Sequence, residues 1–124
     1  MSLNSLEEIA QFIVAEGKGI LAADESNPTC GKRFDSIGVE STEENRRDYR
    51  EMLFRSLGMK NNIGGVILFD ETIRQRAKDG TPLIELINNQ GALPGIKVDK
   101  GLEPLQESPE ESLTQGLEGL DERC

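Results

Sequence analysis

The chain contains no histidine and no tryptophan, and its 124 residues include one tyrosine and two cysteines. Without histidine, it lacks the side chain that most often serves as general base or zinc ligand near neutral pH. Cys30 and Cys124 lie far apart and form no Cys-x-x-Cys motif, which excludes a disulfide framework or a zinc site. We therefore expect reduced thiols, and we interpret Cys30 as an incidental thiol because no histidine can activate it.

Positive charge is also scarce, with 14 basic against 23 acidic residues and a net charge of −9. This balance argues against affinity for nucleic acid or an anionic membrane, so an anionic ligand needs a local basic site. No run reaches the roughly 18 apolar residues of a membrane span. The first residues lack the features of a signal peptide, and we expect a cytoplasmic protein. The length suits one domain.

Three segments share one layout, in which glycine precedes an apolar run that ends in an aspartate. They are "GKGILAADES" (17–26), "GGVILFDET" (64–72) and "GIKVDKG" (95–101). Their short length and glycine flanks favour buried strands. The lack of alternation in the second segment is typical of a parallel strand that is covered on both faces.

Helical patterns separate these strands. Apolar spacing predicts helices over 5–16 and from Ser41, where Ser41 and Glu44 have capping-box spacing and Gly58 ends the helix. The expected apolar stripe of this second helix is Tyr49, Met52, Leu53 and Leu57, and its wet face includes Glu43, Arg46, Arg47 and Arg50.

Two further helices are predicted over 81–92, with Pro82 at the first helical position, and over 112–124, where Gly116 and Gly119 weaken the pattern. Residues 26–40 read as a loop with room for a short helical turn. An initial helix followed by three β/α units implies a parallel sheet and favours a β/α barrel. Functional groups of that fold lie at the carboxyl ends of the strands.

The strand ends contain a lysine between carboxylates. Alternate residues of a strand face the same side, so Lys97 and Asp99 share a face and Asp24 extends the face of Ile20 and Ala22. If both faces point into a barrel mouth, Asp24, Lys97 and Asp99 converge. Spacing alone fits two alternatives: an ion pair without a catalytic task, or a site where acids tune lysine chemistry or phosphate binding.

Hydroxyls and cations gather just after the first strand. Ser26, Thr29, Lys32 and Arg33, together with Lys97, can hold a phosphate, and the alternative is a polar loop with solvated charges. A separate pair of acids, Asp70 and Glu71, is interpreted as acids at the start of a helix.

Five motifs in register closely resemble the amino-terminal part of class I fructose-bisphosphate aldolase. They are "KGILAADES", "STEENRR", "GGVILFDET", "GIKVDKG" and "TQGLEGLDERC". The resemblance implies a TIM-type (β/α)8 barrel, usually a homotetramer, that cleaves fructose bisphosphate through a lysine Schiff base without a cofactor. It implies no nucleic-acid or membrane partner. The motif combination makes another Schiff-base barrel lyase a poor alternative.

The resemblance also assigns roles to single residues. It implies that Asp24 is catalytic, together with Lys97. It implies contacts to the sugar bisphosphate and its phosphates from Ser26, Thr29, Lys32, Arg33 and Lys97. Thr29 replaces a family serine, and Asp70 stands where many members have histidine, which supports its interpretation as an acid at a helix start.

The same resemblance places the Schiff-base lysine and the acid/base glutamate on later strands, outside these 124 residues. Residues 1–16 then form a leading helix and residues 17–124 the first three of eight β/α units. Three strands cannot close a barrel, so we expect the free chain to be poorly stable or prone to associate. The alternative to an aldolase piece is a non-enzymatic product with weak sugar-phosphate affinity or a role in barrel assembly.

Overall fold

The structure is a computed structural model that describes residues 3–108 and 110–124. The helices are α1 (Leu6–Ile13), α2 (Asn27–Asp35), α3 (Glu43–Phe54), α4 (Met59–Asn62), α5 (Asp70–Ile73), α6 (Leu83–Asn89) and α7 (Leu120–Arg123). The strands are β1 (Gly19–Ala23), β2 (Ile63–Leu68), β3 (Leu93–Ile96), β4 (Leu102–Pro104) and β5 (Ser112–Thr114).

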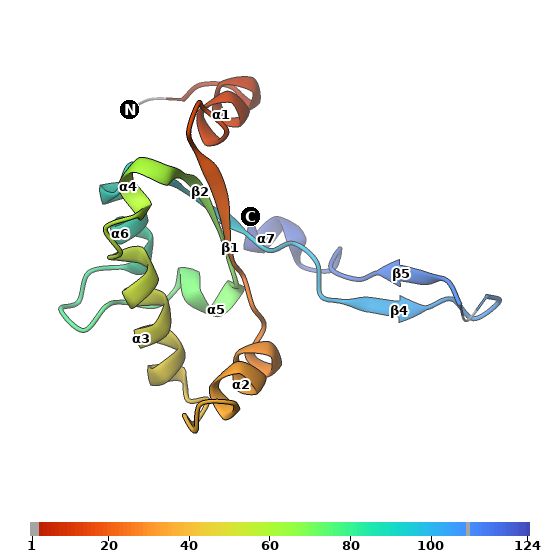
Figure 1. The fold of residues 1–124 in the computed structure, drawn as a ribbon. Helices are drawn as coiled ribbons and strands as arrows, with labels where there is room; N and C mark the ends of the chain where they lie inside the picture. The colour runs from red at the N-terminus through yellow and green to blue at the C-terminus, as the bar shows by residue number, and fades with distance from the viewer. Residues whose placement is uncertain (1–2, 109) are drawn as a thin grey trace.

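Strands β1, β2 and β3 form a parallel sheet in that order, as the three repeated segments predict. Helices α3, α4 and α6 lie on one side of the sheet and leave its other side largely open (Figure 1). The strands run in one direction because helices connect them, which brings their carboxyl ends to one edge. The predicted α/β architecture is therefore confirmed.

The two faces of the sheet differ in side-chain size and burial. On the helix-covered face, Ala23, Val66 and Leu68 are buried against residues such as Phe54 of α3 and Ile87 of α6. On the open face, Ala22 pairs in register with Ile67, and Ile67 pairs with Gly95. The hydrophobic core therefore lies entirely between the sheet and the helices.

Helix α1 packs on the amino-terminal half of β2, where two glycines permit the approach. A Cβ atom at Gly64 would lie 2.2 Å from the carbonyl oxygen of Ile13, and one at Gly65 would lie 3.1 Å from the Ile13 side chain. Because the nearest atom at Gly64 is backbone, no rotamer change relieves the clash. Glycine at this position is what lets α1 dock.

Helix α3 begins one residue later than the capping-box pattern predicts. Thr42 is the N-cap, and its hydroxyl accepts a hydrogen bond from the Asn45 amide at 3.1 Å, while Ser41 instead accepts from the Arg46 side chain at 3.2 Å. Threonine and serine are both good caps, so sequence alone did not separate the two neighbours.

The apolar stripe predicted for α3 is wrong in part. Met52 and Leu57 are 60% and 95% exposed, whereas Arg50 and Phe54 are fully buried. The predicted solvent-exposed face is also wrong at Arg50, because its buried guanidinium donates a hydrogen bond to the main-chain carbonyl of Glu25. The helix also ends at Phe54 with Arg55 as its C-cap, and Gly58, with a φ of −71°, precedes α4 instead of ending α3.

Residues 27–35 form a helix, α2, where the sequence predicted a loop with room for a short helical turn. Ser26 is its N-cap residue and Pro28 lies in the first turn, a position that suits proline. The buried side chains Cys30 and Phe34 are one turn apart, and the Phe34 ring packs edge-on against Tyr49 with centroids 5.7 Å apart. This short apolar pair holds an otherwise polar helix in place.

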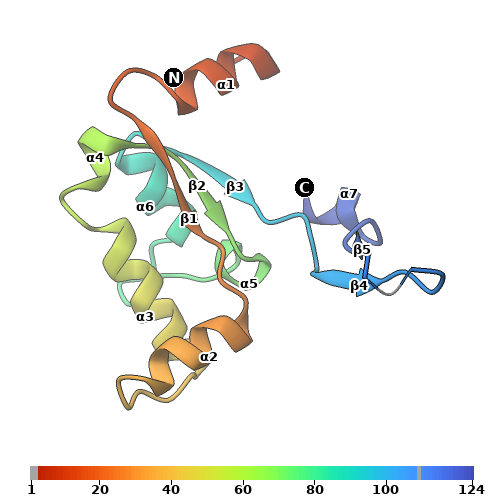
Figure 2. The same ribbon diagram turned by 45° about the vertical axis from the view of Figure 1, so that its right-hand side comes forward.

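The carboxy-terminal region also differs from the prediction. Antiparallel β4 and β5 form a hairpin that projects away from the sheet, and only the four residues of α7 are helical (Figures 1 and 2). Gly116 and Gly119 have positive φ values of 133° and 71°, which interrupts the predicted helix over 112–124. The predicted third strand is also shorter, because β3 ends at Ile96.

The position of the α3 cap generates a local prediction. Thr42→Ala removes the acceptor of the Asn45 amide, so that amide should exchange its hydrogen about fivefold faster, equivalent to the ~1 kcal/mol of a lost cap. Ser41→Ala, the matched control, should leave the rate unchanged. Hydrogen exchange followed by NMR measures both, and equal effects of the two substitutions would contradict the assignment of the cap.

The open sheet generates a second prediction. Within the described residues, β1 and β3 each have one unpaired edge, and Ile20 on the open face is half exposed. Edges and apolar surface of this kind promote pairing with other chains. Sedimentation velocity over a range of protein concentrations should therefore show self-association, and a monodisperse monomer with cooperative thermal unfolding would refute the expectation.

Candidate functional site

The carboxyl ends of the three parallel strands bring together residues that are far apart in sequence. Asp24 directly follows β1, Phe69 follows β2 and Lys97 follows β3. The Lys97 amide donates to the Leu68 carbonyl at 2.8 Å, which continues the strand pairing by one bond and aims the lysine along the sheet edge. This edge is where functional residues of barrel proteins are found.

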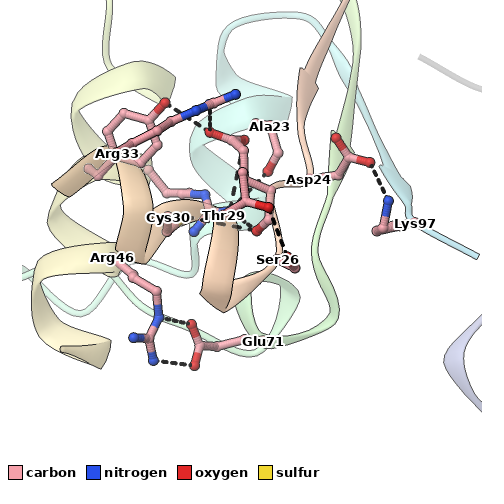
Figure 3. Close-up of polar contacts among 12 residues, drawn as sticks. Ala23, Asp24, Ser26, Thr29, Cys30, Arg33, Arg46, Glu71 and Lys97 are labelled. Atoms are coloured by element: carbon pink, nitrogen blue, oxygen red, sulfur yellow. Dashed lines mark hydrogen bonds and ion pairs between the residues drawn. The ribbon is translucent and has the colours of Figure 1, made fainter. Parts of the chain in front are cut away.

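Lys97 lies between two carboxylates, as the sequence predicts. Its Nζ atom is 3.3 Å from Oδ2 of Asp24 and 3.1 Å from Oδ1 of Asp99, and the first contact is drawn in Figure 3. The hydrogen bond to Asp99, with that to Asp24, raises the pKa of Lys97 against the opposing effect of partial burial. The same contact lowers the pKa of Asp99. The lysine is therefore a fixed cation at neutral pH.

A pocket of about 620 Å³ opens beside this ion pair, a volume in the range of small-molecule sites. The residues that line it are Ser26, Phe69, Asp70, Glu71, Lys97, Asp99, Lys100, Gly101 and Arg123. Two of its acids are neutralised from outside, because Asp70 pairs with Arg74 and Glu71 pairs with Arg46. Asp99 is paired with Lys97, which leaves Lys100 and Arg123 as the lining cations that form no ion pair with a described residue.

The Glu71 pair is bidentate. Arg46 Nε and Nη2 donate to the two carboxylate oxygens of Glu71 at 2.9 and 3.0 Å (Figure 3). The hydrogen bond from Arg46 lowers the pKa of Glu71. Asp70 and Glu71 do start helix α5, as expected, but Glu71 also ties α5 to α3, a contact that the sequence did not reveal.

The cluster predicted after the first strand is only partly brought to the pocket. Ser26 lines the pocket, and its hydroxyl lies 3.1 Å from that of Thr29. Thr29, Lys32 and Arg33 belong to α2 and are not among the described residues that line it. Arg33 instead donates to Glu25 at 2.7 Å, and Lys32 is exposed.

Glu25 lies next to the candidate site, and its contacts were not predicted from the sequence. Its side chain is 8% exposed and accepts hydrogen bonds from Arg33 and, at 3.0 Å, from the Tyr49 hydroxyl. Burial, with the hydrogen bond to Glu25, raises the pKa of Tyr49. Adjacent residues of an extended chain point to opposite sides, so Asp24 faces Lys97 while Glu25 faces the helices. That alternation is the signal that could have separated the two acids.

The main chain around Asp24 is held by Arg50 of α3. Arg50 Nη2 donates to the carbonyl oxygen of Glu25 at 2.8 Å and lies 3.5 Å from that of Ala23. A carboxylate oxygen of Glu25 is 3.9 Å away, so the main-chain contact is the closer one. Sequence reasoning placed this arginine in solvent because a charged residue is rarely fully buried.

Metal ligands, thiols and apolar helices are the remaining features to consider. Within residues 3–108 and 110–124, no group of three or more potential metal ligands is found. Cys30 is buried and Cys124 exposed, both as free thiols, and burial raises the pKa of Cys30, which makes it a poor nucleophile. Among the same residues, no helix is long and apolar enough to cross a membrane.

Comparison with known proteins points to one family. The family model described as fructose-bisphosphate aldolase class-I matches residues 5–124. The chain is 58% identical over 122 residues to a fructose-bisphosphate aldolase of Drosophila melanogaster, covering 98% of this chain and 34% of that protein. It is 54% identical over 123 residues to a probable class 1 aldolase of Xanthomonas campestris, covering 99% and 37%.

A solved structure has the same fold. The fructose-bisphosphate aldolase of Plasmodium falciparum, crystallised with TRAP and a small-molecule inhibitor, matches with a TM-score of 0.89 and 52% identity, covering 94% of this chain and 33% of that chain. This match confirms the fold class as an open, partial α/β sheet of the aldolase TIM-barrel type. The chain spans about a third of the length of the relatives it matches. With the family model covering residues 5–124, this protein belongs to the class I fructose-bisphosphate aldolase family.

Proposed function

We propose that this chain forms the first part of an aldolase active site, which cleaves fructose bisphosphate reversibly to dihydroxyacetone phosphate and glyceraldehyde phosphate through a lysine Schiff base. The observation that carries the proposal is the contact of Asp24 with Lys97, which lines a pocket together with Lys100 and Arg123. Family membership supports the same reaction. In the complete enzyme the assembly is a homotetramer.

Lys97 acts in this proposal as a cation and not as the Schiff-base nucleophile. A nucleophilic lysine must attack as the neutral amine, which requires a lowered pKa. Contacts with Asp99 and Asp24 raise the pKa of Lys97, which keeps the ammonium charged. A fixed ammonium beside the pocket suits a phosphate or an oxyanion of the substrate.

Asp24 supplies the carboxylate that assists carbinolamine formation and proton transfer. About a quarter of its side chain is exposed, so substrate can reach it. The pair thus places a proton acceptor and a cation within 3.3 Å of each other.

The hydroxyls and cations after β1 bind the phosphates and hydroxyls of the sugar. Ser26 contacts ligand in the pocket itself, with Thr29 supporting its hydroxyl. Lys32 and Arg33 reach the ligand from helix α2, and a phosphate at Arg33 competes with Glu25 for the guanidinium. Arg33 is exposed, so a phosphate can reach it, and the buried Glu25 keeps the hydrogen bond from the Tyr49 hydroxyl when Arg33 turns to the ligand.

The 124 residues contribute three of the eight β/α units and, by the resemblance, contain neither the Schiff-base lysine nor the acid/base glutamate. We therefore propose that the chain alone does not catalyse the reaction. The second candidate, weak sugar-phosphate binding or a barrel-assembly role, is favoured by the open sheet face and unpaired strand edges. We propose a cytoplasmic location, although one similar protein of Chlamydomonas reinhardtii is described as chloroplastic.

Borohydride trapping tests the absence of a nucleophile. Incubation with dihydroxyacetone phosphate and borohydride should leave the intact mass of the chain unchanged, because Lys97 is held protonated. A full-length aldolase treated in parallel should gain the reduced adduct. An adduct on this chain would show that one of its own lysines is the nucleophile and would refute the assigned roles.

Ligand titration tests the cationic role of Lys97. Lys97→Met should weaken the binding of fructose bisphosphate about tenfold, because a charge-assisted hydrogen bond contributes about 1.5 kcal/mol or more. Lys78→Met is the matched control, since Lys78 is exposed and pairs with Asp48 away from the pocket. Calorimetric titration measures both, and equal losses of affinity would assign the effect to net charge instead of the site.

A further inference from the structure

Two arginines donate to main-chain carbonyls on either side of the contact between Asp24 and Lys97. We infer that Arg50 and Arg123 are positioning residues, which fix the backbone at Asp24 and at Lys97 so that the two side chains meet. The catalytic meaning of this arrangement rests on the proposed function. The geometry itself does not, because it concerns contacts within this chain.

The need for such positioning follows from where the strand pairing ends. The last pair between β1 and β2 is Ala23 with Leu68, and the last between β2 and β3 is Leu68 with Ile96. Asp24 and Lys97 are each the next residue along the chain. The Lys97 amide still donates to the Leu68 carbonyl at 2.8 Å, so at Lys97 the unpaired backbone begins with its own carbonyl group. Beyond these points the backbone is free to turn unless other donors hold it, and β2 separates the two residues.

Arg50 holds the first of these two positions. It lies 2.8 Å from the Glu25 carbonyl and 3.5 Å from the Ala23 carbonyl, the two main-chain groups that flank Asp24. Carbonyls two residues apart in an extended chain point the same way, so one guanidinium reaches both. The side chain of Asp24 is left to point toward Lys97.

The chemistry of Arg50 indicates more than space filling. Its side chain is fully buried, and among the described residues its Nε and Nη1 atoms have no hydrogen-bond partner. A buried charge is costly, and a hydrocarbon of similar volume often stabilises a core at least as well. The feature that a hydrocarbon does not provide is the donor aimed at the main chain around Asp24.

Arg123 holds the second position from helix α7. Its Nη2 donates to the Val98 carbonyl at 3.0 Å and to that of Gly116 at 2.5 Å, and its Nη1 lies 3.5 Å from the Lys97 carbonyl. A Cβ at Gly116 would lie 2.3 Å from the Val98 carbonyl oxygen. Glycine therefore lets the carboxy-terminal segment approach the end of β3 closely enough for Arg123 to reach it.

The titration of Lys97 by NMR distinguishes positioning from electrostatics, because the two predict opposite signs. The charged groups facing Lys97 are Asp24 and Asp99, with Asp70, Glu71, Lys100 and Arg123 around the same pocket. Removing a nearby positive charge raises a lysine pKa by relieving repulsion. Losing the alignment with Asp24 instead removes a hydrogen bond that raises it.

We therefore expect Arg50→Met and Arg123→Met each to lower the pKa of Lys97. The matched control is Arg55→Met, which makes the same change at the C-cap of α3, at an arginine that pairs with Glu51 and Asp79. It should leave the Lys97 titration unchanged. An unchanged or raised pKa in the Arg50 or Arg123 variants, or an equal fall in the control, overturns the inference.

Folding of the variants is checked by circular dichroism. If Arg50→Met does not fold, Arg50→Lys replaces it, because lysine keeps the charge while shortening the reach to the carbonyls, and the same fall is expected. An unchanged pKa in a folded Arg50→Lys variant overturns the role of Arg50. A lowered pKa in a chain that binds no fructose bisphosphate would support the positioning role and reject the proposed function separately.

Discussion

The parallel alignment of three strands is the constraint on which the site depends. It is imposed by packing, because one face of the sheet buries Val66 and Leu68 against helices α3 and α6. Parallel strands place all their carboxyl ends at one edge. Asp24 and Lys97, 73 residues apart in sequence, therefore come within 3.3 Å although β2 lies between their strands in the sheet.

Adjacent residues of an extended chain point to opposite sides, so the two acids that follow β1 point in different directions. Asp24 continues the open face and meets Lys97, whereas Glu25 continues the covered face and meets Tyr49 and Arg33. Two identical charges in adjacent positions are thus separated by the backbone and neutralised by different partners. The arrangement lets one carboxylate stay accessible to ligand while the other secures helices α2 and α3 beneath it.

The sequence was sufficient for the features that depend on local pattern. Apolar runs after glycine located the three parallel strands, and period-two alternation placed Asp24, Lys97 and Asp99 together. The sequence pattern was insufficient where contacts between residues far apart in the chain determine the structure. Arg50 is buried because carbonyls 25 and 27 positions earlier in the chain accept its hydrogen bonds. The apolar periodicity of the helix does not reveal these contacts.

The other errors have equally specific causes. The polar segment 27–35 is helical because Cys30 and Phe34 find a buried place beside Tyr49, which composition does not reveal. The helix expected over 112–124 is interrupted because Gly116 adopts a positive φ that brings Arg123 to the end of β3. Both errors lie next to the site, where long-range contacts override local preference.

One face of the sheet forms the hydrophobic core and the other ends in the candidate site, and this division explains why the site tolerates so much charge. Ala22, Gly65 and Gly95 on the open face bury little side-chain area, so at about 25 cal/mol per Å² the helix-covered face supplies most of the hydrophobic stabilisation. Charged groups at the edge of the open face therefore displace little of the core. Their alignment depends instead on directional contacts to the main chain, from the buried Arg50 on the covered side and from Arg123 of α7.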